Sequence, residues 1–224
     1  ELATNEHIVL THRGERTILI HHHPYPYALP KRLPTPKRVY YTSLGSGHEE
    51  MEQALVGFLD THSSIRVTFQ PGTFQLKRGA RGTKAILAKT DILVMNKEEA
   101  ARFLETPVSS PIQSQLTRFL ELGPRIAVIT DGEQGSYAAD ADSSWFCPSF
   151  PVPCVERTGA GDSYATTLTW AIDKGFSLPE AMRYGTANAA SVIQHIGPHA
   201  GLLSREGVER WMKKYASVKP KPLC

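Results

Sequence analysis

One stretch of small residues followed by an acid is the part of this chain best suited to chemistry. It runs from Glu156 to Ser163 and places Gly159, Ala160 and Gly161 directly before Asp162, at the head of a helical pattern. Small residues let backbone N–H groups approach a ligand closely, and the first N–H groups of a helix have no partner within the helix. A phosphate or a developing oxyanion suits them, and Asp162 can take a proton from an attacking hydroxyl. These residues predict phosphoryl transfer to an alcohol; a plain glycine turn with Asp162 as a charge complement is the alternative.

This stretch resembles the C-terminal signature of the ribokinase, or PfkB, family of carbohydrate and nucleoside kinases, which reads Asp-Thr-Thr-Gly-Ala-Gly-Asp followed by Ser or Thr. The chain carries Glu156 and Arg157 where that signature has Asp and Thr, and then matches it from Thr158 onward. The resemblance implies a monovalent cation such as K⁺ near Glu156, Thr158 and the loop at Gly197. Since Glu is one methylene longer than Asp, its carboxylate is expected to be displaced from the usual position of such a ligand.

A second match begins with an apolar strand pattern, Asp91 to Asn96, and an acid three residues later, Glu99. It is similar to the family's Asn-x-x-Glu motif, which organises Mg²⁺ and the phosphates, largely through water. Asn96 and Glu99 stand one helical turn apart and can face the same site. The same pair fits a capping box at the start of a helix, and the two interpretations are compatible.

A third match is the strand pattern Ile126 to Thr130, which breaks into a loop with glycines three apart. It resembles the family's nucleotide loop, in which a Thr or Lys and then Gly-x-x-Gly wrap the phosphates and ribose of ATP. The resemblance gives that role to Thr130, Gly132 and Gly135. On its own, Asp131-Gly132 is also a strong hairpin-turn signal.

The fourth match is a helical segment rich in small residues, Ala181 to Val192. It resembles a late helix of the family whose Asn lies against the adenosine, so the resemblance assigns a nucleotide contact to Asn188. Close packing of one helix on another explains the neighbouring alanines equally well.

Length and composition agree with a globular enzyme core. The chain has 224 residues, 41% of them hydrophobic, and a formal net charge of +3 with its Lys and Arg residues spread along it. No nucleic-acid partner is needed to explain this charge, and no apolar run is long enough for a membrane span. Three cysteines without metal-type spacing, and no visible signal peptide, favour a reducing compartment, so we expect a cytoplasmic protein.

Alternating strand and helix patterns predict an α/β fold. We expect a ribokinase-like three-layer sandwich, with a mainly parallel sheet covered by helices on both faces and ligands at the carboxyl ends of its strands. Residues 1–38 read as a lid-associated hairpin, turning at Arg13-Gly14, and a proline-rich connection; residues 39–224 read as the nucleotide-binding and catalytic core. Between the strands, Arg81 to Lys89 is predicted to be helical.

The resemblance covers the family's middle and C-terminal portion. The opening strands that hold the phosphate acceptor have no counterpart, so the N-terminal part of the fold is expected to be missing. Uncovered sheet edges and apolar faces then predict pairing with another chain, such as a homodimer.

The resemblance implies ATP-dependent phosphorylation of a sugar or nucleoside hydroxyl with ATP and Mg²⁺. The alternative is a non-catalytic module that binds adenine nucleotides and lacks an acceptor site. We expect the chain by itself to bind ATP or ADP without sugar-kinase activity.

Overall fold

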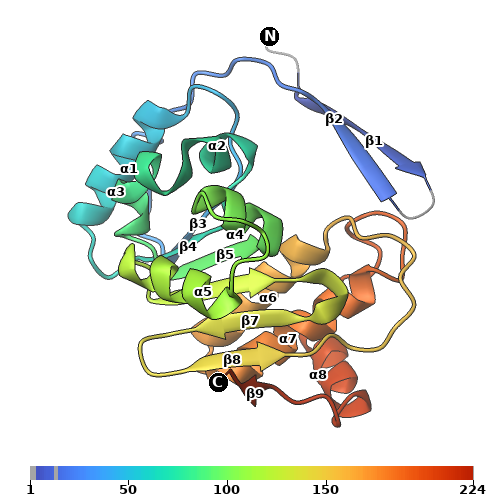
Figure 1. Ribbon diagram of the computed structural model, residues 1–224. Helices are drawn as coiled ribbons and strands as arrows, with labels where there is room; N and C mark the ends of the chain where they lie inside the picture. Colours follow the sequence, from blue (N-terminus) through green and yellow to red (C-terminus); the bar gives the residue numbers. More distant parts are fainter. Residues whose placement is uncertain (1–3, 13–14, 224) are drawn as a thin grey trace.

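The chain forms a seven-stranded sheet preceded by a separate two-stranded hairpin (Figure 1). The computed structural model describes residues 4–12 and 15–223, so the predicted turn at Arg13-Gly14 lies outside the described residues. The hairpin pairs β1 (Glu6–His12) with β2 (Glu15–His21) in antiparallel fashion. An irregular connection rich in proline then leads to the large sheet, because proline lacks the N–H that a sheet ladder requires.

The large sheet is parallel in one half and antiparallel in the other. Its strands lie side by side in the order of the sequence: β3 (Arg38–Tyr41), β4 (Arg66–Phe69), β5 (Ile92–Asn96), β6 (Ile126–Thr130), β7 (Ser136–Ala139), β8 (Ser144–Cys147) and β9 (Lys221–Pro222). Strands β3 to β6 run parallel to one another, and β7, β8 and β9 continue the sheet as antiparallel neighbours. The short β9 was not predicted, because two residues carry no alternating pattern.

Helices cover both faces of this sheet, which gives the three predicted layers (Figure 1). One layer holds α1 (Glu49–Asp60), α2 (Thr73–Gly82), α3 (Lys84–Leu87), α4 (Lys97–Phe103) and α5 (Ile112–Glu121), and the other holds α6 (Ala160–Asp173), α7 (Leu178–Val192) and α8 (Arg205–Lys214). In the part of the chain that the structure describes, none of these helices is both long and apolar enough to cross a lipid bilayer.

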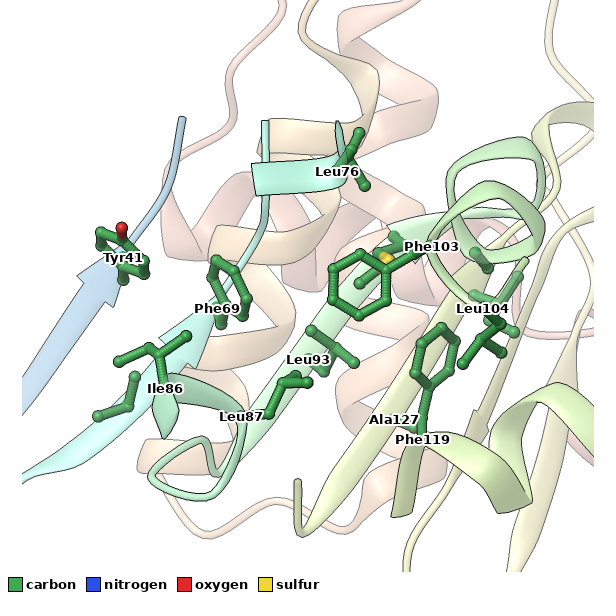
Figure 2. Packing of buried hydrophobic residues seen from close by; sticks show 14 of the residues in the cluster. Tyr41, Phe69, Leu76, Ile86, Leu87, Leu93, Phe103, Leu104, Phe119 and Ala127 are labelled. Carbon is green, nitrogen blue, oxygen red and sulfur yellow. The ribbon is translucent and has the colours of Figure 1, made fainter. Parts of the chain in front are cut away.

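Side-chain alternation along the central strands builds two separate cores. Leu93 and Met95 of β5 pack toward α1–α5, while Ile92 and Val94 pack toward α6–α8. Since successive strand residues point to opposite faces, a strand segment buried on both sides must be apolar throughout, as residues 92–95 of β5 are. Figure 2 shows the first core, where Phe103 of α4 and Phe119 of α5 lie close to the sheet. Apolar packing on both faces therefore holds the ends of the central strands in place at the edge of the sheet.

The predicted helix from Arg81 to Lys89 is confirmed only in part, because most of the helical run lies before it. The structure has α2 from Thr73 to Gly82 and the short α3 from Lys84 to Leu87 instead. Gly72 caps α2, and the Gln75 side chain accepts a hydrogen bond from the Gly72 N–H (3.2 Å). The helical run is interrupted at Gly79, where φ is +61°, a value that glycine adopts easily.

Candidate nucleotide and phosphoryl-transfer site

A cavity of about 940 Å³ lies at the carboxyl ends of β5 and β6. It is bounded by the first turn of α6 on one side and by the β6–β7 loop on the other. The predicted site residues that line it are Asn96, Glu99, Thr130, Gly132, Gly135, Gly159, Ala160, Gly161 and Asp162. Three sequence motifs separated by up to 66 positions therefore meet in one place, which is where ligands bind in parallel α/β sheets.

Asn96 and Glu99 form the capping box that the sequence allowed. The Asn96 side chain accepts from the Glu99 N–H (2.8 Å), and the Glu99 carboxylate accepts from the Asn96 N–H (2.9 Å). Burial raises the pKa of Glu99 above its ordinary value, and the nearby Asp162 adds to the shift, while the hydrogen bond from Asn96 opposes it. Carboxylate and amide oxygens are the ligands that Mg²⁺ prefers, so the pair fits a hydrated magnesium ion.

The pairing of β6 with its two neighbouring strands fixes the position of Thr130. Thr130 lies opposite Asn96 across the parallel ladder and opposite Ser136 across the antiparallel one. The loop between β6 and β7 is closed by hydrogen bonds from the Asp131 N–H to the Gly135 oxygen (2.8 Å) and from the Gly135 N–H to the Gly132 oxygen (3.2 Å). The turn is thus a hairpin connection that also lines the cavity. Gly135 has φ +107°, and a Cβ there would lie 2.2 Å from the Cys147 oxygen.

The Gly159 turn brings the first residues of α6 to the cavity, where the Ala160 N–H donates to the Arg157 backbone oxygen (3.3 Å). Gly159 is left-handed (φ +80°), and a Cβ there would lie 2.6 Å from the Pro198 Cβ, so glycine is required. Gly161 is different, because a Cβ there would meet nothing within 4 Å. Asp162 sits in the first turn of α6, where the helix dipole favours negative charge. The arrangement is suited to holding an anion next to a carboxylate.

Asp162 is oriented by two side chains from neighbouring strands. Gln70, just after β4, donates from Nε2 to Asp162 Oδ1 (2.8 Å), and the Tyr40 hydroxyl of β3 donates to Gln70 Oε1 (2.5 Å). Burial, and then the charge of Asp162, raise the pKa of Tyr40 well above its ordinary value, which keeps the phenol protonated as a donor. Because the Tyr40 hydroxyl donates to the amide oxygen of Gln70, the amide nitrogen is left facing Asp162.

Glu156, Thr158 and the loop at Gly197 come together, as the sequence predicts. The Glu156 carboxylate accepts from the Gly197 N–H (2.7 Å) through Oε2 and from the Thr158 hydroxyl through Oε1. Both carboxylate oxygens therefore face protein donors. These two hydrogen bonds join the segment before α6 to the loop at Gly197, whether or not a cation is bound nearby.

Asn188 lies away from the cavity. It is 6% exposed, its Nδ2 donates to the Thr167 hydroxyl (2.7 Å), and its Oδ1 accepts from the Leu203 N–H (3.0 Å). Its neighbours Ala189 and Ala190 line the cavity instead. The structure thus brings the small face of α7 to the site but uses the Asn188 amide to join α6, α7 and the segment before α8.

Several lining residues were not singled out as site residues from the sequence. They are Gln70, Glu98, Arg157, Cys154 and the segment from Ser149 to Val152. Gln70 directly follows β4, so the rule that ligands gather at strand ends could have identified it. Arg157 stands inside the most informative stretch, but nothing in its spacing shows which way its side chain points.

Comparisons with known proteins agree with this geometry. The pfkB family carbohydrate kinase model matches residues 5–205. An ATP-dependent 6-phosphofructokinase of Thermoanaerobacterium thermosaccharolyticum is 26% identical over 121 residues, which is 53% of this chain and 36% of that protein. A 5-dehydro-2-deoxygluconokinase of Clostridium perfringens is 26% identical over 133 residues, or 58% of this chain and 39% of the relative. The matches thus span little more than a third of these relatives.

Solved structures share the fold at low sequence identity. A putative ribokinase II of Escherichia coli in complex with ATP and Mg²⁺ has a TM-score of 0.76 at 19% identity, covering 95% of this chain and 72% of that one. A nucleoside kinase of Burkholderia thailandensis in complex with inosine has a TM-score of 0.76 at 16% identity, covering 96% and 71%. The predicted ribokinase-like α/β fold is confirmed, and the chain belongs to the pfkB family of carbohydrate kinases.

Proposed function

We propose that this protein transfers the γ-phosphoryl group of ATP to a hydroxyl of a small sugar or nucleoside. The observation that carries the proposal is the placement of Asp162 beside the Gly159–Gly161 turn, in the same cavity as Asn96, Glu99 and the Thr130 loop. A base next to an anion site is what phosphoryl transfer to an alcohol requires, because the reaction demands positioning and charge stabilisation above all.

The nucleotide side of the cavity is assigned to backbone and small side chains. Thr130, Gly132 and Gly135 contact the phosphates and ribose, while Ala189 and Ala190 leave room for the flat base. Asn188 supports this pocket from behind through its bonds to Thr167 and Leu203 rather than by touching the base.

The reacting groups meet at the N-terminus of α6. The N–H groups of Gly159, Ala160 and Gly161 stabilise the charge that develops on the transferred phosphoryl group, and Asp162 takes the proton of the attacking hydroxyl. Gln70 holds one oxygen of that carboxylate, which leaves the other to face the acceptor. Asn96 and Glu99 hold magnesium through water; when bound, the metal supplies positive charge that neutralises the phosphates. A K⁺ ion near Glu156 and Thr158 would add to the positive field of the anion site.

Calorimetry with ATP and Mg²⁺, followed by an ADP-release assay with pentoses, hexoses and nucleosides, tests the proposal. We expect nucleotide binding that Mg²⁺ strengthens. Nucleotide binding with no acceptor binding or turnover in any natural form of the protein favours the alternative, a non-catalytic nucleotide module. A chain that binds neither ATP nor ADP contradicts both.

We also propose that the β1–β2 hairpin pairs with a second copy of the chain. Its strands expose Ile8 (59%), Leu10 (53%) and Leu19 (51%), and exposed apolar side chains on a two-stranded sheet favour association. Sedimentation equilibrium should show a dimer that Leu19→Ser weakens. A monomer at all concentrations contradicts this proposal without affecting the nucleotide site.

A further inference from the structure

We propose that Arg157 is a phosphate-binding residue, held on Glu133 until a nucleotide displaces that carboxylate. This inference rests on the proposed function and adds a contact that the family signature does not supply, because that signature has an uncharged Thr at the position of Arg157. Both residues line the cavity and come from different segments of the chain. Arg157 precedes the Gly159 turn, and Glu133 stands in the β6–β7 loop.

The geometry places the ion pair across the space between the two phosphate-binding elements. Arg157 Nη2 lies 2.7 Å from Glu133 Oε1. The loop end of this pair is anchored, since the Ser149 hydroxyl donates to the Glu133 backbone oxygen (2.6 Å). A polyphosphate that reaches from the β6–β7 loop to the N-terminus of α6 must therefore pass next to the guanidinium.

The charge balance of the cavity shows why a cation is needed there. Among the described residues that line the cavity, the acids are Glu98, Glu99, Asp131, Glu133 and Asp162, and Arg157 is the one Lys or Arg. Lys97 stands nearby but pairs with Asp131 at 2.9 Å. A nucleotide polyphosphate entering this acidic cavity gains charge-assisted hydrogen bonds from a guanidinium whose planar fork matches phosphate oxygens.

The exchange from Glu133 to phosphate costs little. The side chains of Arg157 and Glu133 are 56% and 76% exposed, and exposed ion pairs of this kind contribute little to stability. A phosphate carries more charge than the carboxylate and offers more acceptor oxygens, so it is the stronger partner. Glu133 then acts as a competitor for the guanidinium, and removing its charge is expected to strengthen nucleotide binding.

The test compares binding of ATP, ADP and adenosine, each with Mg²⁺, by calorimetry on four proteins: the wild type, Arg157→Met, Glu133→Gln and Arg205→Met. Arg205 is the matched control, because it also forms an exposed pair, with Glu209 (2.9 Å), but on α8 outside the cavity lining. We expect Arg157→Met to weaken ATP binding by about 10-fold and to leave adenosine binding unchanged, since charged hydrogen bonds to phosphate are lost. Glu133→Gln should strengthen ATP binding by about 3-fold as one acid leaves the cavity.

The outcomes separate this inference from the proposed function. Equal ATP affinity in the wild type and Arg157→Met overturns the inference alone, and so does an equal loss for ATP and adenosine, which indicates a merely structural role. Weaker ATP binding by Glu133→Gln also contradicts it. If the wild type binds none of the three ligands, the proposed function fails together with the inference. Thermal unfolding of Arg157→Met, expected near that of the wild type, checks that the variant is folded.

Discussion

At the carboxyl edge of the large sheet the polar side chains of the candidate site are held by hydrogen bonds to their neighbours, whereas the β1–β2 hairpin leaves its apolar side chains in solvent. Asn96 and Glu99 cap each other, and Asp162 is held by Gln70. In the hairpin, Ile8 stands opposite Leu19 in the ladder, and both are more than half exposed. Contacts within the fold hold the side chains of the candidate site in place, while the apolar side chains of the hairpin need another molecule to cover them. Residues of this chain can therefore be assigned to the nucleotide side of the site, whereas none is assigned to the binding of the phosphate acceptor.

The largest effect is expected from the base at the organised edge. Asp162→Asn keeps the shape of the side chain but cannot accept the proton, so kcat should fall by about 10² to 10⁴-fold while ATP affinity stays close to wild type. Asp142→Asn, at an exposed position between β7 and β8, is the control and should change neither quantity. Steady-state kinetics with the best acceptor makes the measurement, and a loss of only a few-fold sinks the assignment.

Substitutions in the core and in the hairpin should differ strongly in their effect on the free energy of unfolding. Phe119 is 1% exposed and packs against Phe103 with ring centroids 6.1 Å apart, so Phe119→Ala should lower the free energy of unfolding by about 3 to 5 kcal/mol. Leu19→Ala, at a position 51% exposed, should change it by about 0.5 kcal/mol or less. Urea unfolding of both variants, at a protein concentration where the chain is monomeric, checks the contrast, and a large loss in the hairpin variant shows that the hairpin is already packed within the monomer.

Two glycines of the same turn should respond differently. Gly159→Ala forces a side chain into a left-handed position against Pro198 and should cost about 1 to 3 kcal/mol of stability. Gly161→Ala has open space around its Cβ and should leave stability near wild type, while weakening binding of ATP with Mg²⁺ because the methyl group lies in the cavity. Thermal melts and calorimetry separate the two effects; equal melting temperatures contradict the structural role given to Gly159.

The smallest effect concerns the pH dependence that Glu99 adds to stability. Because burial raises its pKa in the folded state, the folded protein binds this proton more tightly than the unfolded chain does, and stability falls as pH rises from 4.5 through the raised pKa. Glu99→Gln should therefore melt at a higher temperature than wild type at pH 7, with the gap closing toward pH 4.5. Added Mg²⁺ should stabilise the wild type more than the variant. A variant less stable than wild type at pH 7 contradicts this.

Local sequence was enough to predict the residues that act through backbone geometry. Gly159 and Gly135 occupy turns that few other residues can adopt, and the spacing of Asn96 and Glu99 describes a cap as well as a ligand pair. These features depend on neighbours in the sequence. They also fall at strand ends, whose common edge follows from the parallel order of β4 to β6.

Side-chain direction across long sequence distances was not predictable. The contact of Gln70 with Asp162 joins positions 92 apart, and Asn188 faces Thr167 and Leu203 rather than the cavity. Nothing in the local pattern around Asn188 indicates which of its helix faces meets α6. The position of α2 was not predicted, because its polar sequence and Gly79 give no clear helical pattern. This helix is stabilised by tertiary packing, which the local sequence does not show.

Alkylation of Cys154 tests directly whether the cavity at the carboxyl edge binds a magnesium nucleotide. Cys154 is exposed and lines the cavity, whereas Cys147 is buried and serves as the internal reference. The rate of iodoacetamide labelling at each thiol is followed by peptide mass spectrometry with and without saturating ATP and Mg²⁺. We predict that the nucleotide slows labelling of Cys154 by about 5-fold or more, because a bound ligand excludes the reagent from the cavity. An unchanged rate at Cys154 with saturating nucleotide would contradict the account.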